Sequence, residues 1–150
     1  MELTIDGQSF DLPGAWEHDL SLGRLLATAR SRGETSTMPY VQGTTPFPLR
    51  RDEVIVDLTM QVFGDKDSTG TPHANEYLGL ADNLLFLTDF VADRMDGTTD
   101  TYTATLDVHG ARTFTAEVQI LNFQLVRHAL TVAYVAYDLR IPAGRWTEVP

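Results

Sequence analysis

Residues 71–95, TPHANEYLGLADNLLFLTDFVADRM, form the one long stretch of this sequence that carries a helical pattern. Large apolar residues recur in it at steps of three and four, which keeps one stripe of a helix facing inward. Thr71 suits an N-cap, Pro72 suits the first helical position because its missing N–H is not needed there, and Gly97 suits a C-terminal cap. We therefore expect a helix over about residues 72–95 whose buried stripe organises the domain. The predicted core residues of this helix are Tyr77, Leu80, Leu84, Leu87 and Val91.

Strand patterns lie on both sides of the predicted helix. Near the start of the chain, Leu3 and Ile5 alternate with polar residues and are followed by Asp6-Gly7, a pair that supplies the positive φ angles of a two-residue hairpin turn. A second hairpin is predicted at Gly110. The longer predicted strands cover residues 52–64, 98–109, 112–124 and 128–141. The last of them is apolar on both faces, as expected in the middle of a sheet or against a neighbouring subunit.

Strands that surround a single helix favour a mainly β fold, an antiparallel β-sandwich or half-barrel with the helix packed against one face or end. This order of elements does not indicate a βαβ nucleotide-binding fold. A chain of 150 residues is one domain of ordinary size. Residues 1–150 are therefore predicted to fold as a single domain.

Residues 17–48 have a weaker pattern, interrupted by three glycines and three prolines, and are too long for an ordinary buried connection. One interpretation is a flexible surface loop. The other is an arm that leaves the domain and packs on a neighbouring subunit, which would explain an apolar content higher than a solvated loop needs. The candidate subunit-interface residues are Leu25, Leu26, Met38, Tyr40, Val41 and Phe47. The pattern leaves both interpretations open.

Composition limits the function classes. Eleven basic and 21 acidic residues give a net charge of −10, which disfavours nucleic-acid binding because phosphate neutralisation supplies most of that affinity. The sequence has no cysteine, which excludes disulfides and thiolate metal sites and fits a reducing cytosol. It also lacks the long apolar run of a membrane span and the pattern of a signal peptide.

Chemical motifs are sparse. The segment Asp65–Glu76 has the acidic spacing of a calcium loop, but a strand leads into it and Pro72 stands where such loops carry an apolar residue, so a polar strand-to-helix connection is the preferred interpretation. The four histidines lie in separate segments and are interpreted as surface or strand-edge residues. No nucleophile elbow or phosphate-binding loop occurs. We expect no enzyme, no cofactor and no metal site, although two carboxylates are enough for a glycosidase.

The order of motifs in the second half resembles that of a known family. A strand ending in V-x-G with an acidic turn is followed by a helix with N-L-x-x-L, a strand with A-E-V and a last strand that finishes with a proline and a tryptophan. The matching positions are Val62, Gly64 and Asp65, then Asn83, Leu84 and Leu87, then Ala116, Glu117 and Val118, and finally Pro142 and Trp146. This order resembles the minor tail proteins of long-tailed actinobacterial phages and, through them, the N-terminal domain of distal tail (Dit) proteins. The arm departs from the family pattern, since VQGTTPFP replaces the usual proline-glycine-arginine-x-glycine run.

The resemblance implies a structural virion protein that assembles in the host cytoplasm. It implies a ring, commonly of six copies, at the distal end of a phage tail, with the arm clasping the neighbouring subunit. The implied partners are other copies of the chain, the tail-tube protein, the tail hub or tip protein and the tape-measure protein. DNA would pass through the lumen without specific binding, and no membrane is involved.

Two other functions fit the same pattern. A tail-tube or tail-terminator subunit would share the sandwich, the helix and the ring. A carbohydrate-binding β-sandwich is less favoured, because Trp16 and Trp146 would have to form an exposed aromatic platform.

Overall fold

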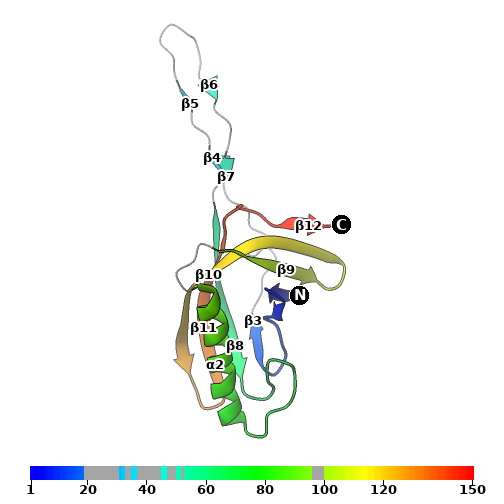
Figure 1. The fold of residues 1–150 in the computed structure, drawn as a ribbon, viewed down its shortest axis with the longest axis vertical. Coiled ribbons are helices and arrows are strands. Elements are labelled where there is room, and N and C mark those ends of the chain that lie inside the picture. The colour runs from blue at the N-terminus through cyan, green and yellow to red at the C-terminus, as the bar shows by residue number, and fades with distance from the viewer. Residues whose placement is uncertain (19–30, 33–34, 37–44, 47–49, 52, 96–99) are drawn as a thin grey trace.

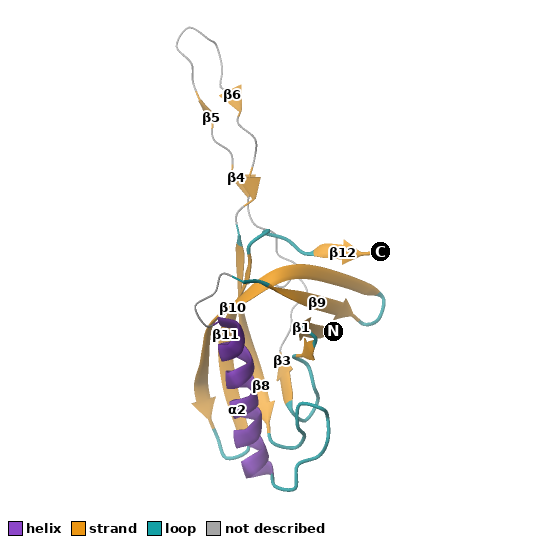
Figure 2. Ribbon diagram, viewed as in Figure 1, coloured by secondary structure: helices purple, strands orange, loops and turns teal. Residues whose placement is uncertain are grey.

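The computed structural model describes residues 1–18, 31–32, 35–36, 45–46, 50–51, 53–95 and 100–150. In this part of the chain, eight strands form one antiparallel sheet in the order β2-β1-β9-β10-β11-β8-β3, with β12 paired to β10. These strands are β1 (Glu2–Ile5), β2 (Gln8–Ser9), β3 (Trp16–His18), β8 (Val54–Phe63), β9 (Tyr102–Val108), β10 (Arg112–His128), β11 (Val132–Ile141) and β12 (Thr147–Val149). The helix α2 (Glu76–Met95) packs against the sheet where it curls (Figures 1 and 2). The expected mainly β half-barrel with one long helix is confirmed.

Strand β10 gives the sheet its curl. Its first half pairs with β9 on one side, and its second half pairs with β11 on the other. The pairing with β11 shifts register between Leu121 and Gln124 and again between Leu125 and Arg127. At the first shift Asn122 has a positive φ of 54°. Bulges of this kind bend a strand and increase its twist, so β10 can pass from one half of the sheet into the other.

The helix begins at Glu76, four residues later than predicted. Asn75 is the N-cap, because its side-chain oxygen accepts hydrogen bonds from the N–H groups of Tyr77 (2.9 Å) and Leu78 (3.3 Å). Thr71 instead donates its N–H to Asp67 (2.9 Å), and Pro72 forms a β-bridge with Lys66. The Thr-Pro pair therefore belongs to the preceding turn, and the asparagine carries the capping interaction.

The buried face of the helix is rotated relative to the predicted stripe. Leu80, Leu87 and Val91 are buried, Leu84 is half-buried, and Tyr77 is 58% exposed, so its assignment to the core is wrong. At about 100° per residue, the face that meets the sheet is centred between Leu80 and the buried polar residue Asn83. Tyr77 falls outside that face and Leu84 lies on its edge. The buried residues of α2 are Gly79, Leu80, Asn83, Leu87, Phe90 and Val91.

The last hairpin also differs from the prediction. Residues 128–141 were expected to be one strand, but β10 extends to His128 and the chain reverses before β11 begins at Val132. The turn is closed by a hydrogen bond from the N–H of Ala129 to the carbonyl of Val132 (2.8 Å). It contains neither glycine nor proline, which is why its sequence carries no turn signal. The first predicted hairpin is confirmed, with φ angles of 49° and 78° at Asp6 and Gly7.

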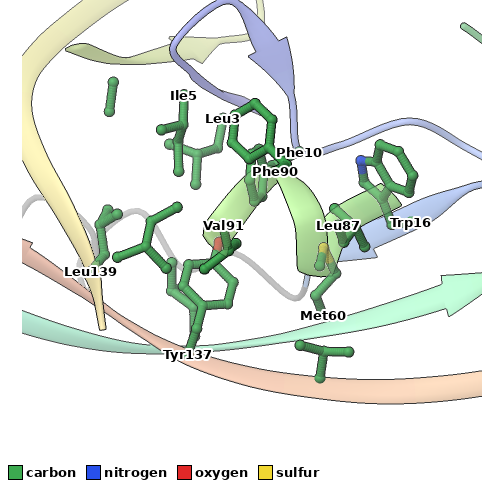
Figure 3. Packing of buried hydrophobic residues seen from close by; sticks show 14 of the residues in the cluster. Leu3, Ile5, Phe10, Trp16, Met60, Leu87, Phe90, Val91, Tyr137 and Leu139 are labelled. Carbon is green, nitrogen blue, oxygen red and sulfur yellow. The ribbon is translucent and has the colours of Figure 1, made fainter. Parts of the chain in front are cut away.

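The core lies between α2 and the concave side of the sheet (Figure 3). Trp16 is fully buried and stacks on Phe86 of α2, with ring centroids 5.7 Å apart and planes 9° apart. Phe10 meets Phe90 edge to face at 5.6 Å. Because aromatic side chains bury large areas and prefer such arrangements, these pairs fix where the helix sits on the sheet.

Two short ribbons belong to the predicted arm. Strand β4 (Ser31–Arg32) pairs antiparallel with β7 (Arg50–Arg51), and β5 (Thr35–Ser36) pairs antiparallel with β6 (Thr45–Pro46). Both ribbons stand beyond the sheet and helix along the longest axis of the molecule (Figure 1). The six candidate interface residues lie outside the described residues; they are Leu25, Leu26, Met38, Tyr40, Val41 and Phe47.

Candidate functional site

The carboxylate of Asp11 connects β1 and β3, which lie near opposite ends of the strand order of the sheet. Its Oδ2 accepts a hydrogen bond from the N–H of Leu3 in β1 (2.7 Å), and its Oδ1 accepts one from the N–H of His18 in β3 (3.2 Å). Hydrogen bonds to an ionised carboxylate are roughly twice as strong as neutral ones. This side chain therefore connects β1 to β3 where the two strands do not pair directly.

The side chain of His18 has no exposed surface, so the interpretation as a surface histidine is wrong at this position, although His18 does end β3, an edge strand of the sheet. Its Nδ1–H donates to the carbonyl of Phe10 (2.8 Å), which leaves Nε2 to accept a hydrogen bond from the hydroxyl of Tyr137 (2.6 Å). Burial, with a smaller contribution from the charge of Asp11, raises the pKa of Tyr137 well above its usual range. The phenol therefore stays protonated and remains a donor. The His18 side chain has no exposed surface, so this group holds the core together and does not face a substrate.

The helix meets the end of β8 through two glycines and Asn83. A Cβ added to Gly64 would overlap the carbonyl oxygen of Glu76, and a Cβ added to Gly79 would overlap the carbonyl oxygen of Gly64. Beside them, the Asn83 amide donates to the carbonyls of Phe63 and Lys66, both at 2.7 Å. Gly64 and Asn83, two residues of the family resemblance, therefore have structural roles at this junction.

The segment Asp65–Glu76 is a turn held by its own hydrogen bonds. One carboxylate oxygen of Asp67 accepts from the N–H of Thr69 (2.8 Å), the hydroxyl of Thr69 (2.6 Å) and the N–H of Thr71 (2.9 Å). These hydrogen bonds stabilise the ionised carboxylate and lower the pKa of Asp67. Across the described residues, no group of three or more His, Asp or Glu side chains is placed to hold a metal ion.

A shallow cleft of about 270 Å³ lies beside the C-terminal end of α2. It is lined by Arg94, Met95, Asp100, Tyr102, Gln119, Ile120, Leu121 and Arg140. Both arginines are already engaged: Arg94 pairs with Asp6 (2.6 Å), and Arg140 pairs with Glu53 and also donates to Gln119 (2.8 Å). The cleft therefore offers neither a free cation for an anionic ligand nor a nucleophile with a base beside it.

The side of α2 that faces away from the sheet carries exposed apolar residues, and we call it the outer helix face. It exposes Leu78 (67%) and Leu85 (62%), seven residues apart and so on the same side of the helix. Grouped apolar exposure of this kind marks interaction surfaces in soluble proteins. Leu78 and Leu85 lie in the predicted helical stretch but outside the predicted buried stripe. Their spacing of seven residues is the sequence signal that could have identified a second, exposed apolar face.

A second apolar group lies at the tip of the β10–β11 hairpin, where Leu125, Val126 and Leu130 are exposed. The two tryptophans, in contrast, are buried, Trp16 completely and Trp146 at 8% exposure. They cannot form the exposed platform on which the carbohydrate-binding alternative depended. Among the described residues, no helix is both long and apolar enough to cross a membrane.

Comparison with known proteins finds a similar fold. No protein-family model matches the sequence, and no curated protein matches it. Among solved structures, the chain is similar to the Dit protein of phage SPP1, with a TM-score of 0.58 at 14% identity. The similarity covers 95% of this chain and 50% of that one, so this chain spans about half the length of the SPP1 protein. That protein is described as a paradigm of the hub adsorption apparatus in phages that infect Gram-positive bacteria. At this identity the comparison shows a shared fold.

Proposed function

We propose that this chain is a structural virion protein that forms a ring at the distal end of a long phage tail and joins the tail tube to the tip hub. The observation that carries the proposal is the similarity of nearly the whole chain to the Dit protein of phage SPP1. The residues that align with the motif order support it, because Gly64 and Asn83 build the junction between β8 and α2.

A ring also suits the surface of the molecule. Copies that contact one another head to tail need two different adhesive surfaces on each subunit. The chain presents two such surfaces, the outer helix face and the projecting ribbons of the arm. The proposed role of residues 17–48 is to clasp the neighbouring subunit. Its proposed contact residues are Leu25, Leu26, Met38, Tyr40, Val41 and Phe47.

The proposed partners are further copies of the chain, with six in the ring, together with the tail-tube, hub and tape-measure proteins. Six copies at a net charge of −10 carry −60 in total. Acidic side chains that face the lumen would repel the phosphates of passing DNA and keep it from adhering. The ring would thus have an acidic inner surface that DNA passes without specific binding.

Mass measurement by light scattering over a concentration series, combined with negative-stain imaging, tests the ring. We expect closed rings with a mass near six times 16.7 kDa. Purified tail-tube protein, added as a second component, should increase the yield of rings by providing a docking surface. Long tubes of this chain alone would instead indicate a tail-tube subunit. A strict monomer that also fails to bind tail-tube and hub proteins in a pull-down would contradict the proposal.

A further inference from the structure

Positive charge is concentrated in one segment of the chain. Residues 24–51 contain five arginines and one glutamate, a net charge of +4, so the other 122 residues carry −10 − 4 = −14. The ribbon of β4 and β7 places Arg32 directly opposite Arg50, with Arg51 next along the strand. This ribbon stands clear of the sheet and helix of its own chain (Figure 1). The β4–β7 ribbon is thus a basic projection in a chain whose other residues are net acidic.

The outer helix face has the opposite character. At about 100° per residue, Leu78 and Leu85 lie side by side with Ala81, and the row immediately next to them is formed by Asp82 and Asp89. Asp93 continues this acidic row toward the end of the helix. Across the described residues, none of the three aspartates forms an ion pair, whereas Asp6, Glu53 and Glu148 do. The face is therefore apolar and acidic, and it has no ion-pair partner in the part of the chain that the structure describes.

We propose that the outer helix face binds the β4–β7 ribbon of a second copy of this chain. The proposal rests on the ring-forming function and specifies the surface by which neighbouring copies hold each other. The charges of the two surfaces are complementary, and the apolar stripe supplies area that becomes buried on contact. Because ribbon and helix face differ, every copy uses one of each, and such heterologous contacts extend until the ring closes.

Disulfide trapping tests the contact directly, because the natural chain has no cysteine. The variants Ser31→Cys, on β4, and Leu85→Cys, on the outer helix face, are purified separately, mixed and oxidised. Docking places the two thiols at an effective concentration in the millimolar range, so we expect cross-linking about tenfold or more faster than for undocked thiols. The control mixes Ser31→Cys with Leu130→Cys, whose position at the hairpin tip is 75% exposed.

Charge reversal shows whether the aspartates select the ribbon. Asp82→Lys with Asp89→Lys should slow the cross-linking, and Arg32→Glu with Arg50→Glu in the other partner should restore it. The matched control reverses Glu17 and Asp65, two exposed acids that lie off α2 and make no ion pair among the described residues, and should leave the rate unchanged. Raising the salt from 0.1 M to 1 M, where the screening length falls from about 10 Å to about 3 Å, should slow the wild-type reaction as well.

The outcomes separate the inference from the ring proposal. Fast cross-linking at Leu85 that follows the charge pattern supports the inference. Rings that form normally while cross-linking at Leu85 is no faster than at Leu130 overturn the inference and leave the ring proposal standing. Absence of both cross-linking and self-association, with tail-tube protein present, overturns both.

Discussion

Gly64 at the end of β8 lies directly against Gly79 in the second turn of α2. Each glycine lacks the Cβ that would collide with the other segment: a Cβ on Gly64 would lie 2.6 Å from the backbone nitrogen of Leu80, and one on Gly79 would lie 2.6 Å from the ring of His73. This pair sets how closely the helix approaches the sheet. Since the collisions on Gly64 are with backbone atoms, small side-chain movements cannot relieve them.

Gly64→Ala should therefore destabilise the fold by about 3 kcal/mol, the upper part of the range for overpacking. Chemical denaturation monitored by circular dichroism measures this. Gly70→Ala is the control, because its Cβ would meet nothing within 4 Å and it carries only the cost of a positive φ of 83°. We expect that cost to be about 1 kcal/mol. Equal losses of unfolding free energy for the two variants would show that the close contact at Gly64 does not make the substitution more costly.

Asn83→Ala should lower the free energy of unfolding by about 3 kcal/mol, because it removes two hydrogen bonds of 2.7 Å that a buried side chain donates to the carbonyls of Phe63 and Lys66. Asn75→Ala removes the N-cap of the same helix and should cost only about 1 kcal/mol. Urea denaturation of both variants gives the comparison. A larger loss at Asn75 would mean that the loop between β8 and α2 is held by other contacts.

Tyr137→Phe should destabilise the protein by about 1–2 kcal/mol at pH 7, because the Nε2 of His18 loses its donor inside the core. Tyr134→Phe, on the half-buried face of the same strand, is the matched control and should change stability by less than about 0.5 kcal/mol. Thermal unfolding at matched protein concentration measures both. Similar losses for the two phenylalanine variants would contradict a structural role for the hydroxyl.

The same tyrosine predicts a pH dependence. Its folded-state pKa is raised above the unfolded value near 10, so above that pH the unfolded state loses the phenol proton while the folded state keeps it. Because the unfolded state then binds fewer protons, stability falls as the pH rises. The stability contributed by this group is thus fully present below about pH 10 and is lost as the pH rises toward the folded pKa. The difference between wild type and Tyr137→Phe should therefore shrink between pH 9 and pH 11; a difference that stays constant would contradict this.

Leucines on the two sides of the helix should behave differently. Leu87→Ala removes a fully buried side chain and should cost about 2–5 kcal/mol, whereas Leu85→Ala, on the outer helix face, should cost less than about 0.5 kcal/mol. Denaturation of the isolated chain measures both. If Leu85→Ala destabilises the isolated chain as much as Leu87→Ala, the outer helix face is not an open surface.

Deleting residues 25–42 should leave the body folded while preventing ring formation. Among the described residues, the deleted segment supplies strands β4 and β5 of the two arm ribbons but no strand of the eight-stranded sheet and no part of α2. Circular dichroism should therefore retain the wild-type spectrum of the body, and light scattering should report monomers. If the deleted protein still forms rings of wild-type size, the arm is only a surface loop.

Several features were predictable because they depend on neighbours in the sequence. Alternation along β8 identified the buried side of that strand, and Asp6-Gly7 identified a turn whose φ angles only such residues adopt readily. A local rule failed at the start of the helix. Thr71 was predicted to be the N-cap, but its N–H is bound by Asp67 in the preceding turn, and Asn75 caps the helix instead.

The amino-acid sequence by itself determined the class of fold, the existence of the long helix and the segregation of charge between arm and body, because these follow from periodicity and composition. Only the tertiary structure decided which side of the helix is buried. The contact of Gly64 with Gly79 and the bonds of Asn83 rotate α2 so that Tyr77 and Leu85 face outward. The structure likewise buried His18, because its partners Phe10 and Tyr137 are 8 and 119 residues away in the chain. Pairings over such separations depend on packing, which no local pattern encodes.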